Sequence, residues 1–421
     1  ELSVRSKMNH SAFVFILLIG LMHGYTAHAA PSFTLQQIVA MAAEQNPSIN
    51  ISRAREQSAT ASVVTANTFS NPQLEFGAGP TSYRTPGGQG NNGNWGVALS
   101  QPLDFPSVRS ARKEVAENNV QVASLGIELT KTDVRTRVKG AFYDVLQRQA
   151  VLELAEADRN LLKDIRERIK LRVDVGESPK YELIKADTES LAAERDFQAA
   201  RVRVTEAKAY LRGLIGGNVP EDFDLSGELP LGTSLPRIDE LRERINDATQ
   251  LKQIRAAIKT SEANLRLQEQ LRNPGLTVKA GIEQDPDLRQ LRLGIAIPLP
   301  VWDKRSGPIA QAAAEVREVN AILSDRELAI KRDIESAYQR YLIAQQQVSA
   351  FENGLLAQAE AVLKVAEAAY RYGERGILDY LDAQRTKRVV RKDYLSARYE
   401  YINTILEIER LLGYELLEVK S

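Results

Sequence analysis

The sequence predicts a mainly α-helical chain with a small β part, built from one structural unit that occurs twice. Triplets that begin at residues 101, 141 and 214 recur at 297, 337 and 411, at distances of 196, 196 and 197 residues, which indicates an internal duplication. Each half contains two short segments in which apolar and polar residues alternate, as in strands. Each half also contains long runs with apolar residues at steps of four and three, as in helices.

The first 29 residues have the features of a secretory signal peptide. The apolar stretch 12–22 is too short to span a bilayer, and the small residues around Ala27 and Ala29 resemble a cleavage site after Ala29. The sequence starts at Glu1, whereas Met8 is an alternative translation start. We therefore expect an exported protein.

The composition excludes several functional classes. Lysine plus arginine and aspartate plus glutamate number 55 each, so no basic field attracts nucleic acid. There is no cysteine, which rules out lipid attachment at an N-terminal cysteine, and the three histidines lie in the signal segment. These absences argue against an enzyme, a bound cofactor and a metal site built from soft ligands.

Two pairs of strands are expected, one pair in each copy. The alternating segments are residues 72–79 and 95–102 in the first copy, and 275–283 and 290–298 in the second. No later run of eighteen apolar residues occurs, so any membrane crossing by the mature chain would have to use these strands.

A long helix follows each strand pair. In the second copy the apolar positions form steps of four and three from Ile330 to Ala369, which is the 3.5-residue period of a left-handed coiled coil. The first copy shows the same period from Val134 to Val173. A helix from about 108 to 175 would be roughly 100 Å long.

Each long helix ends at a glycine-containing corner, followed by a returning helix. The corners lie at about 175–179 and 372–376, where Gly176 and Gly373 can adopt a left-handed conformation. We expect two helical hairpins with these corners as tips. The predicted organisation is a first repeat at 30–216, a linker at 217–237 and a second repeat at 238–421.

Four amphipathic strands cannot close a barrel alone, and open sheet edges are not tolerated in lipid. Three copies would supply twelve strands around a water-filled lumen, and the helical rods would pack into a second tube continuous with that barrel. The alternative is a water-soluble protein in which the four strands cover a helical bundle.

Several motifs, in order and duplicated, resemble the TolC family of bacterial outer-membrane efflux ducts. The motifs are "FTLQQIVAMAAEQNPSI", "SQPLDF", "IPLPVWDKRSG", "VGESPKYEL" and "YGERGILDYLDA". The resemblance implies a homotrimer with a twelve-stranded barrel in outer-membrane lipid and a coiled-coil tunnel in the periplasm. It also implies a periplasmic membrane-fusion adaptor and an inner-membrane pump as partners.

The segment "IPLPVWDKRSGPI" is most similar to the heavy-metal efflux branch, which serves pumps of the resistance-nodulation-division type. Pro298 and Pro300 are expected to end the strand ladder, and Asp303 or Ser306 to cap the next helix. Whether the cargo is a metal cation or another small molecule stays open at this point.

The resemblance also implies a gate at the periplasmic end. Asp379 and Asp382 lie three apart on a helix and would form two acidic rings under threefold symmetry, which favours cations. The matching positions imply that Arg375 and Tyr370 tie one hairpin to its neighbour, with Glu182 and Tyr181 as partners. The alternative is that acids in a first helical turn are there only because the helix dipole favours them.

The hairpin tips are the expected contact with the adaptor. The tip residues are Val175, Gly176, Glu177, Ser178, Gly373, Glu374 and Gly376. A plain helix stop accounts for the same glycines equally well.

The function expected from the resemblance is the exit duct of a tripartite efflux system. The rival interpretation is a periplasmic coiled-coil adaptor or structural protein, although the doubling of the whole strand-and-helix unit is not typical of adaptors.

Overall fold

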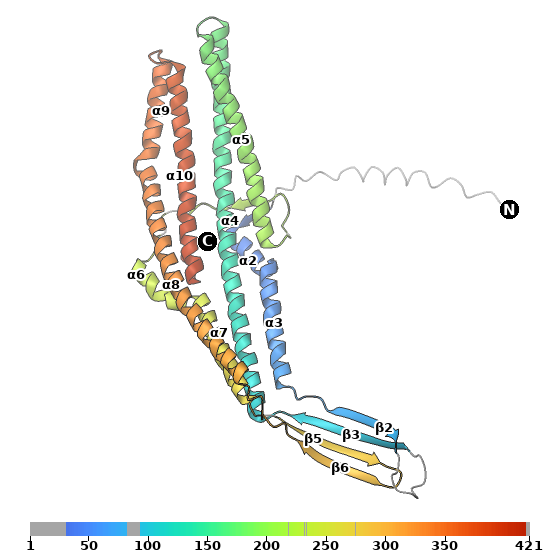
Figure 1. Cartoon of the computed structure of the whole chain (residues 1–421). Helices are drawn as coiled ribbons and strands as arrows, with labels where there is room; N and C mark the ends of the chain where they lie inside the picture. The colour runs from blue at the N-terminus through green and yellow to red at the C-terminus, as the bar shows by residue number, and fades with distance from the viewer. Residues whose placement is uncertain are drawn as a thin grey trace, which may run out of the picture.

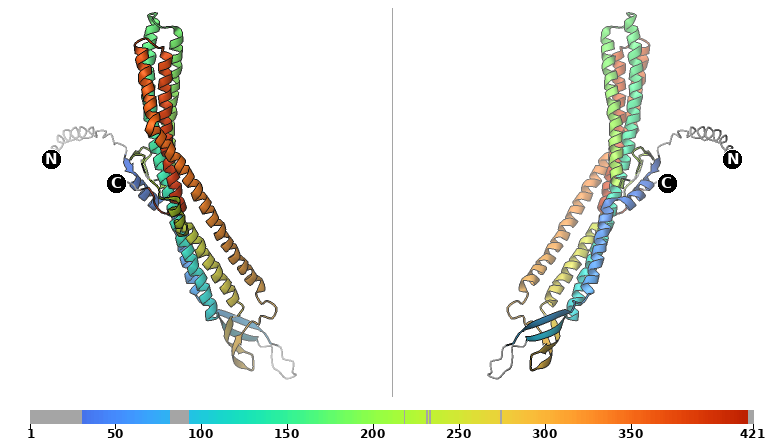
Figure 2. Two further views of the ribbon diagram at one scale, coloured as in Figure 1. Left: turned by 90° about the vertical axis from the view of Figure 1, so that its left-hand side faces the viewer. Right: turned by 90° about the vertical axis from the view of Figure 1, so that its right-hand side faces the viewer.

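The chain forms a long helical body with a small sheet at one end (Figure 1). The computed structural model describes residues 31–81, 93–217, 219–230, 232, 234–273 and 275–417. The expected signal segment and most of the loop at 80–95 lie outside these residues. At the end of the body far from the sheet, two helical hairpins lie side by side (Figure 2). The expectation of a mainly helical fold with a small β part is confirmed.

Both copies follow the same order of elements. The first copy contains α2 (Leu35–Gln45), α3 (Pro47–Asn67), β2 (Gln73–Pro80), β3 (Gly93–Leu103), α4 (Pro106–Asp174) and α5 (Lys180–Ile215). The second contains α6 (Ile238–Glu243), the 3₁₀ helix η1 (Arg244–Asp247), α7 (Thr249–Gln270), β5 (Leu276–Gln284), β6 (Arg289–Ala296), α8 (Ser306–Ala350), the π-helical turn η2 (Phe351–Leu355), α9 (Leu356–Arg371) and α10 (Ile377–Leu412). With 69 residues, α4 is about 100 Å long.

The four strands of the two copies form one antiparallel sheet in the order β2-β3-β5-β6. The register places Val97 opposite Ile282 and Ile282 opposite Leu291, so apolar side chains of neighbouring strands share one face. The other face carries polar and small residues, including the ion pair between Arg292 and Glu283 at 2.9 Å. The residues of the apolar face are Leu74, Phe76, Ala78, Trp95, Val97, Leu99, Val278, Ala280, Ile282, Leu291, Leu293 and Ile295. Within one chain, β2 and β6 are the open edges of this sheet.

The linker contains a strand that the alternation did not reveal. β4 (Asp224–Ser226) pairs in parallel with β1 (Ser32–Thr34), and the rings of Phe223 and Phe33 lie 6.3 Å apart. Parallel pairing joins segments far apart in sequence, and three residues are too few for a periodic signal. The linker therefore belongs to the core at the middle of the rod, where Phe223 is fully buried.

A buried ion pair fixes the C-terminal segment to this core. Lys139 of α4 and Glu409 of α10 are each only 2% exposed, and Lys139 Nζ donates to Glu409 Oε2 at 3.2 Å. Lys139 also donates to Glu415 at 3.1 Å. The other oxygen of Glu409 accepts the N–H groups of Leu416 and Leu417 at 2.6 Å. Both buried charges of the cluster, Lys139 and Glu409, thus have partners, as a buried charge requires.

The long helix of the second copy contains a break that the sequence period did not predict. The π-helical turn η2 inserts one residue between α8 and α9. Below it, Ile334, Ala337 and Tyr341 of the expected seam are buried, but beyond it Val362 and Val365 are exposed. Ala359 and Leu363, one position later than Gln358 and Val362, are buried instead. The expectation of an unbroken seam to Ala369 is therefore wrong, because the inserted residue rotates α9 by one position.

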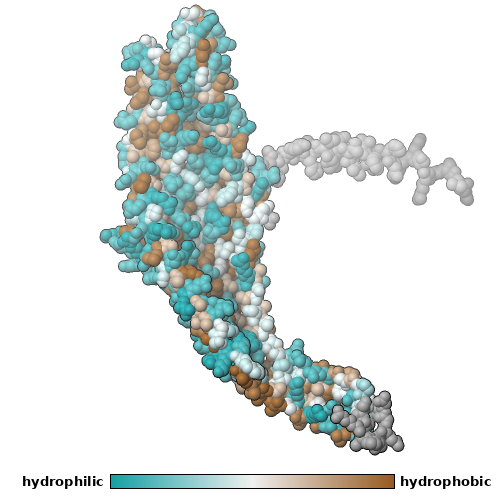
Figure 3. Space-filling view, in the orientation of Figure 1, coloured by the Kyte–Doolittle hydropathy of each residue, from teal (hydrophilic) through white to brown (hydrophobic). Residues whose placement is uncertain are grey.

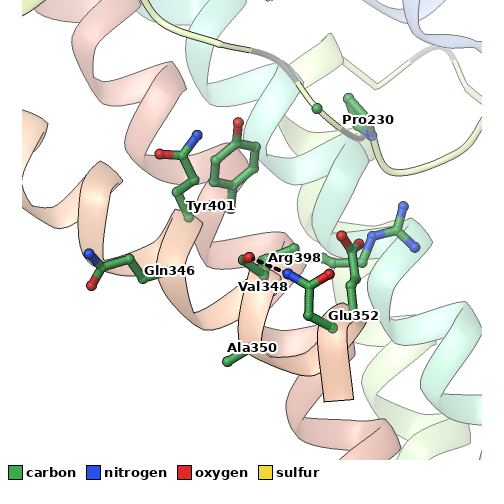
Figure 4. A pocket seen from close by; sticks show the side chains of 11 residues that line it. Pro230, Gln346, Val348, Ala350, Glu352, Arg398 and Tyr401 are labelled. Atoms are coloured by element: carbon green, nitrogen blue, oxygen red, sulfur yellow. Dashed lines mark hydrogen bonds between the residues drawn. The ribbon is translucent and has the colours of Figure 1, made fainter. Parts of the chain in front are cut away.

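The break lies where the linker crosses the helices. Arg398 of α10 donates to the carbonyl of Leu229 at 2.5 Å, and Tyr394 donates to Glu352 of η2 at 2.8 Å. Figure 4 shows Arg398 and Glu352 close to Pro230 of the linker, around a hollow of about 600 Å³. This hollow opens to solvent, since exposed residues such as Gln346 and Ala350 line it.

Asp158 of α4 lies between the two hairpins, and its carboxyl group has a shifted pKa. Burial raises the pKa of Asp158 to about 6, although the positive charges of Arg388, Arg391 and Lys387 on α10 oppose the shift. Because this value lies above the ordinary 3.8, the folded chain binds the proton more tightly than the unfolded chain. The resulting stabilisation is full below about pH 4 and is lost as the pH rises through about 6.

We expect Lys139→Met to lower the free energy of unfolding by about 3–5 kcal/mol, because it leaves the Glu409 carboxylate buried without its cation. Unfolding in detergent, followed by circular dichroism, measures the change. Arg195→Met is the matched control, since the pair of Arg195 and Asp196 is exposed and should contribute less than about 1 kcal/mol. Equal losses for the two variants would contradict the structural role given to Lys139.

We expect Asp158→Asn to stabilise the chain at pH 7.5 by about 1 kcal/mol, after allowance for solvent screening, and to have little effect at pH 4.5. The melting temperature at the two pH values gives the comparison. Asp164→Asn, at an exposed position of the same helix, should change neither value. A gain of equal size at both pH values would show that Asp158 does not titrate between them.

Candidate functional site

The two hairpin tips are built in the same way. Gly176 and Gly373 have φ values of 83° and 76°, in the left-handed region that glycine adopts without strain. The N–H of Glu177 bonds to Arg172 O at 2.8 Å, and that of Glu374 bonds to Ala369 O at 2.9 Å. This six-to-one bond, with the glycine N–H bonded three residues back, is the Schellman motif. Nothing lies within 4 Å of a Cβ added at either glycine, so the backbone conformation alone requires glycine.

The tips also expose apolar side chains at matching positions. Val175 and Tyr372 each precede the left-handed glycine, and both side chains are more than two-thirds exposed. Glu177, Glu374 and Gly376 are exposed beside them, while Ser178 is half-buried. Tyr372 was not among the expected tip residues, although its position matches that of Val175. Exposed apolar side chains at a corner are suited to contact with another protein.

Asp379 and Asp382 lie on the exposed side of α10, just after the second tip. Asp379 is in the first turn of the helix, where the dipole favours a negative charge. Arg375 Nη1 lies 3.4 Å from Asp379 Oδ2, in an exposed pair. Asp382 makes no side-chain ion pair within the part of the chain that the structure describes. Both carboxylates are thus open to solvent in a single chain.

Tyr370, at the end of α9, is held on both sides. Its hydroxyl accepts a hydrogen bond of 3.1 Å from Arg172, near the end of α4. Its ring stacks on Tyr380 of α10, with centroids 5.9 Å apart and planes within 2°. Gln384 donates to the hydroxyl of Tyr380 at 3.0 Å. These contacts join the first hairpin to the second near the tips.

Glu182 and Tyr181 do not bind Arg375 or Tyr370 within one chain. Among the described residues no hydrogen bond or ion pair joins the two sets, and Tyr181 is exposed in the first turns of α5. The hydrogen bonds of Tyr370 and Arg375 go instead to Arg172 and Asp379. A link between these residues would therefore need a neighbouring chain.

Two further residues connect the hairpins and were not found from the sequence. Arg388 of α10 lies 3.1 Å from Glu189 of α5, and both side chains are largely buried. They are 199 residues apart and are of types common on helix surfaces, as are Arg172 and Tyr370. The buried residues around the upper hairpins are Leu162, Ile165, Ile169, Ala186, Ala193, Leu363, Ile377, Tyr380, Leu381 and Ala383.

The described residues contain no group of three or more His, Cys, Asp or Glu placed to hold a metal ion. None of the helices in the described ranges combines the length and apolar character required of a membrane-spanning helix. The features that remain are the tips, the acidic residues of α10 and the amphipathic sheet.

Comparison with known proteins agrees with this architecture. The chain is 24% identical over 393 residues to the cobalt-zinc-cadmium resistance protein CzcC of Cupriavidus metallidurans, covering 92% of both proteins. It is 21% identical over 434 residues to the outer membrane protein TolC of Vibrio cholerae, covering 94% of both. The crystal structure of CusC has a similar fold, with a TM-score of 0.73, 17% identity and coverage of 90% of this chain and 92% of that one. The family model for outer membrane efflux proteins matches residues 38–217 and 241–414, and the chain belongs to this family.

Proposed function

We propose that this protein is the outer-membrane exit duct of a tripartite efflux system. The observation that supports this most is the sheet, which has one continuous apolar face and two open edges at the end of a helical rod. β3 has 11 residues, or about 37 Å along the strand, which at a tilt of about 40° exceeds the apolar band of about 25 Å in outer-membrane barrels. The helices would then extend into the periplasm.

Three copies are the assembly that we infer. Edge strands β2 and β6 of neighbouring copies would pair, and twelve strands would close the sheet without exposing backbone amides to lipid. The helices support this inference, because α5 and α9 carry exposed apolar side chains on the face that does not contact their own chain. The residues are Ile184, Leu191 and Val202 on α5, and Val362 and Val365 on α9. A helix that is apolar on two sides needs a partner on each.

In this assembly the tips form the periplasmic entrance. Asp379 and Asp382 would form two rings of three carboxylates, and such rings favour the passage of cations. Arg375 and Tyr370 would close the entrance together with Arg172, and Glu182 and Tyr181 of a neighbouring copy are the candidate partners of Arg375. Opening is a movement of the second hairpin relative to the first.

The two tips are the proposed docking surface for a periplasmic membrane-fusion adaptor, which connects the duct to an inner-membrane pump. Gly176 and Gly373 leave open space around the turns, and Val175 and Tyr372 offer apolar contacts. We assign the pump to the resistance-nodulation-division type because of the similarity to CzcC, which is named for cobalt, zinc and cadmium resistance. Heavy-metal cations are then the proposed cargo. With only carboxylates available, the duct would conduct metal ions rather than capture them.

The duct and its acidic rings can be tested together by recording currents in a planar bilayer under a salt gradient. We expect the wild-type protein to form cation-selective channels. The double variant Asp379→Ala with Asp382→Ala should lower the ratio of cation to anion permeability about two- to tenfold, because both rings lose their charge. Asp196→Ala, an exposed acid on α5, is the control and should leave selectivity unchanged.

An unchanged reversal potential in the double variant would show that the two acidic rings do not determine ion selectivity. Absence of any channel from the properly folded wild-type protein would overturn the proposed duct itself.

The contacts at the tips should limit opening. We expect Arg375→Ser and Tyr370→Phe each to raise the mean conductance or open probability by about fivefold, which corresponds to the loss of one exposed hydrogen bond. Tyr370→Phe keeps the stack on Tyr380 but removes the hydroxyl that accepts from Arg172. Tyr372→Phe, at the exposed tip, is the matched control. Wild-type currents in both Arg375→Ser and Tyr370→Phe would show that the entrance is closed by other contacts.

A further inference from the structure

The turn between β6 and α8 is rich in exposed apolar side chains. β6 ends at Ala296, yet apolar residues continue at every second position of the sequence for three more steps. The apolar side chains of this series are those of Leu291, Leu293, Ile295, Ile297, Leu299 and Val301. All are more than half exposed, and Trp302, which follows them, is 95% exposed. We call residues 297–302 the exit turn.

Two prolines occupy the positions between these apolar residues. Pro298 and Pro300 have no backbone N–H, so neither leaves an unpaired donor where the strand ladder has ended. The N–H of Val301 bonds to Leu299 O at 2.8 Å. Unpaired N–H groups are costly in lipid but not in water. The composition of the exit turn is therefore suited to an apolar environment without a neighbouring strand.

The exit turn is held in place at its helical end. Arg305 has a φ of 57°, and it is the only non-glycine residue with a positive φ in the described part of the chain. Asp303 Oδ1 accepts the N–H of Arg305 at 2.7 Å, and the Arg305 side chain donates to Gln268 of α7 at 2.7 Å. The expected capping bond from Asp303 or Ser306 to the start of α8 is not formed, because Asp303 supports this turn instead. An unfavourable backbone conformation maintained by specific bonds suggests a functional demand.

The first copy has an equivalent feature. Phe105 lies 196 residues before Val301, follows the end of β3, and continues the same alternation through Leu99 and Leu103. Phe69 is also exposed at this level, with the guanidinium of Arg109 at 4.3 Å from its ring centre. Hydrophobic side chains gather at the elbow where the helices meet the sheet (Figure 3). Charged residues follow directly on the helical side, including Lys304 and Arg305.

We propose that the exit turn lies in the phospholipid interface on the helical side of the membrane and anchors the sheet at that depth. This inference rests on the proposed outer-membrane duct. Tryptophan prefers the region of lipid headgroups, where its ring contacts acyl chains and its N–H contacts polar groups. Lys304, which is exposed directly after the turn, complements lipid phosphates.

The two tryptophans of the chain allow a direct test. Trp95→Phe leaves Trp302 as the sole tryptophan whose fluorescence is followed. Trp302→Phe leaves only Trp95, on the apolar face of β3. Each full-length variant is reconstituted into phosphatidylcholine vesicles with bromine near the carbonyl end or near the tail end of the acyl chains. We expect Trp302 to be quenched about twofold more by bromine near the carbonyl end than by bromine near the tail end, and to be shielded from acrylamide.

The outcomes separate the anchor from the duct. Quenching of Trp95 but not of Trp302, with Trp302 open to acrylamide, would place the turn in water and overturn the anchor while leaving the duct intact. A Trp302 shielded from both quenchers would show that a second copy covers the turn, which also overturns the anchor. Quenching of neither residue by lipid, with both open to acrylamide, would overturn the duct as well.

A second measurement tests the contribution of the turn to insertion. Leu299→Ser with Trp302→Ser should lower the fraction of protein that inserts into vesicles by at least about threefold, without changing its melting temperature in detergent. Leu328→Ser, at an exposed apolar position on α8, is the control and should insert like the wild type. Equal insertion of all three proteins would contradict the anchoring role.

Discussion

The constraint on which the rest of the structure depends is an amphipathic sheet with two unpaired edges. Strands from both copies contribute to one sheet, so the duplication has produced a single surface rather than two domains. Its apolar face is continuous across all four strands, and no helix within the described ranges covers it (Figure 2). Such a face in water would favour aggregation, and its edges would pair with other strands. The proposed closure with further copies in lipid would remove both problems.

The two copies share an order of elements but differ in continuity. α4 runs unbroken from the sheet to the first tip, whereas the corresponding helix of the second copy is divided by η2. The linker crosses the helices at that level and bonds to Arg398. A helix with an inserted residue and a hollow beside it deforms more easily than a continuous one. The asymmetry is consistent with a rigid first hairpin and a second hairpin that moves.

The sequence predicted those parts of the fold whose signal is local and periodic. Alternation identified the four strands, and the glycines at 176 and 373 identified corners that require a positive φ. The sequence did not predict η2, because α9 has apolar residues on two faces. The exposed Val362 fits the apolar period of α8, so nothing in the sequence shows that the buried face passes to Leu363 instead. Nor could it pair Arg172 with Tyr370 or Arg388 with Glu189. These contacts join residues about two hundred positions apart, and only the packing of the hairpins brings them together.

The strength of the contacts changes along the rod. At the middle, Lys139 and Glu409 are buried together with a large core, and breaking such a pair costs several kcal/mol. At the tips, the links of Arg375 and Arg172 are exposed hydrogen bonds of about 1 kcal/mol each. The proposed opening would break these exposed bonds first, and the buried cluster of the upper hairpins, which includes Ile377 and adjoins the pair of Arg388 with Glu189, would limit it. In the proposed gate, Asp379 and Asp382 lie beside these exposed bonds, so a displacement that opens the entrance would also separate the acidic rings that we propose favour cations.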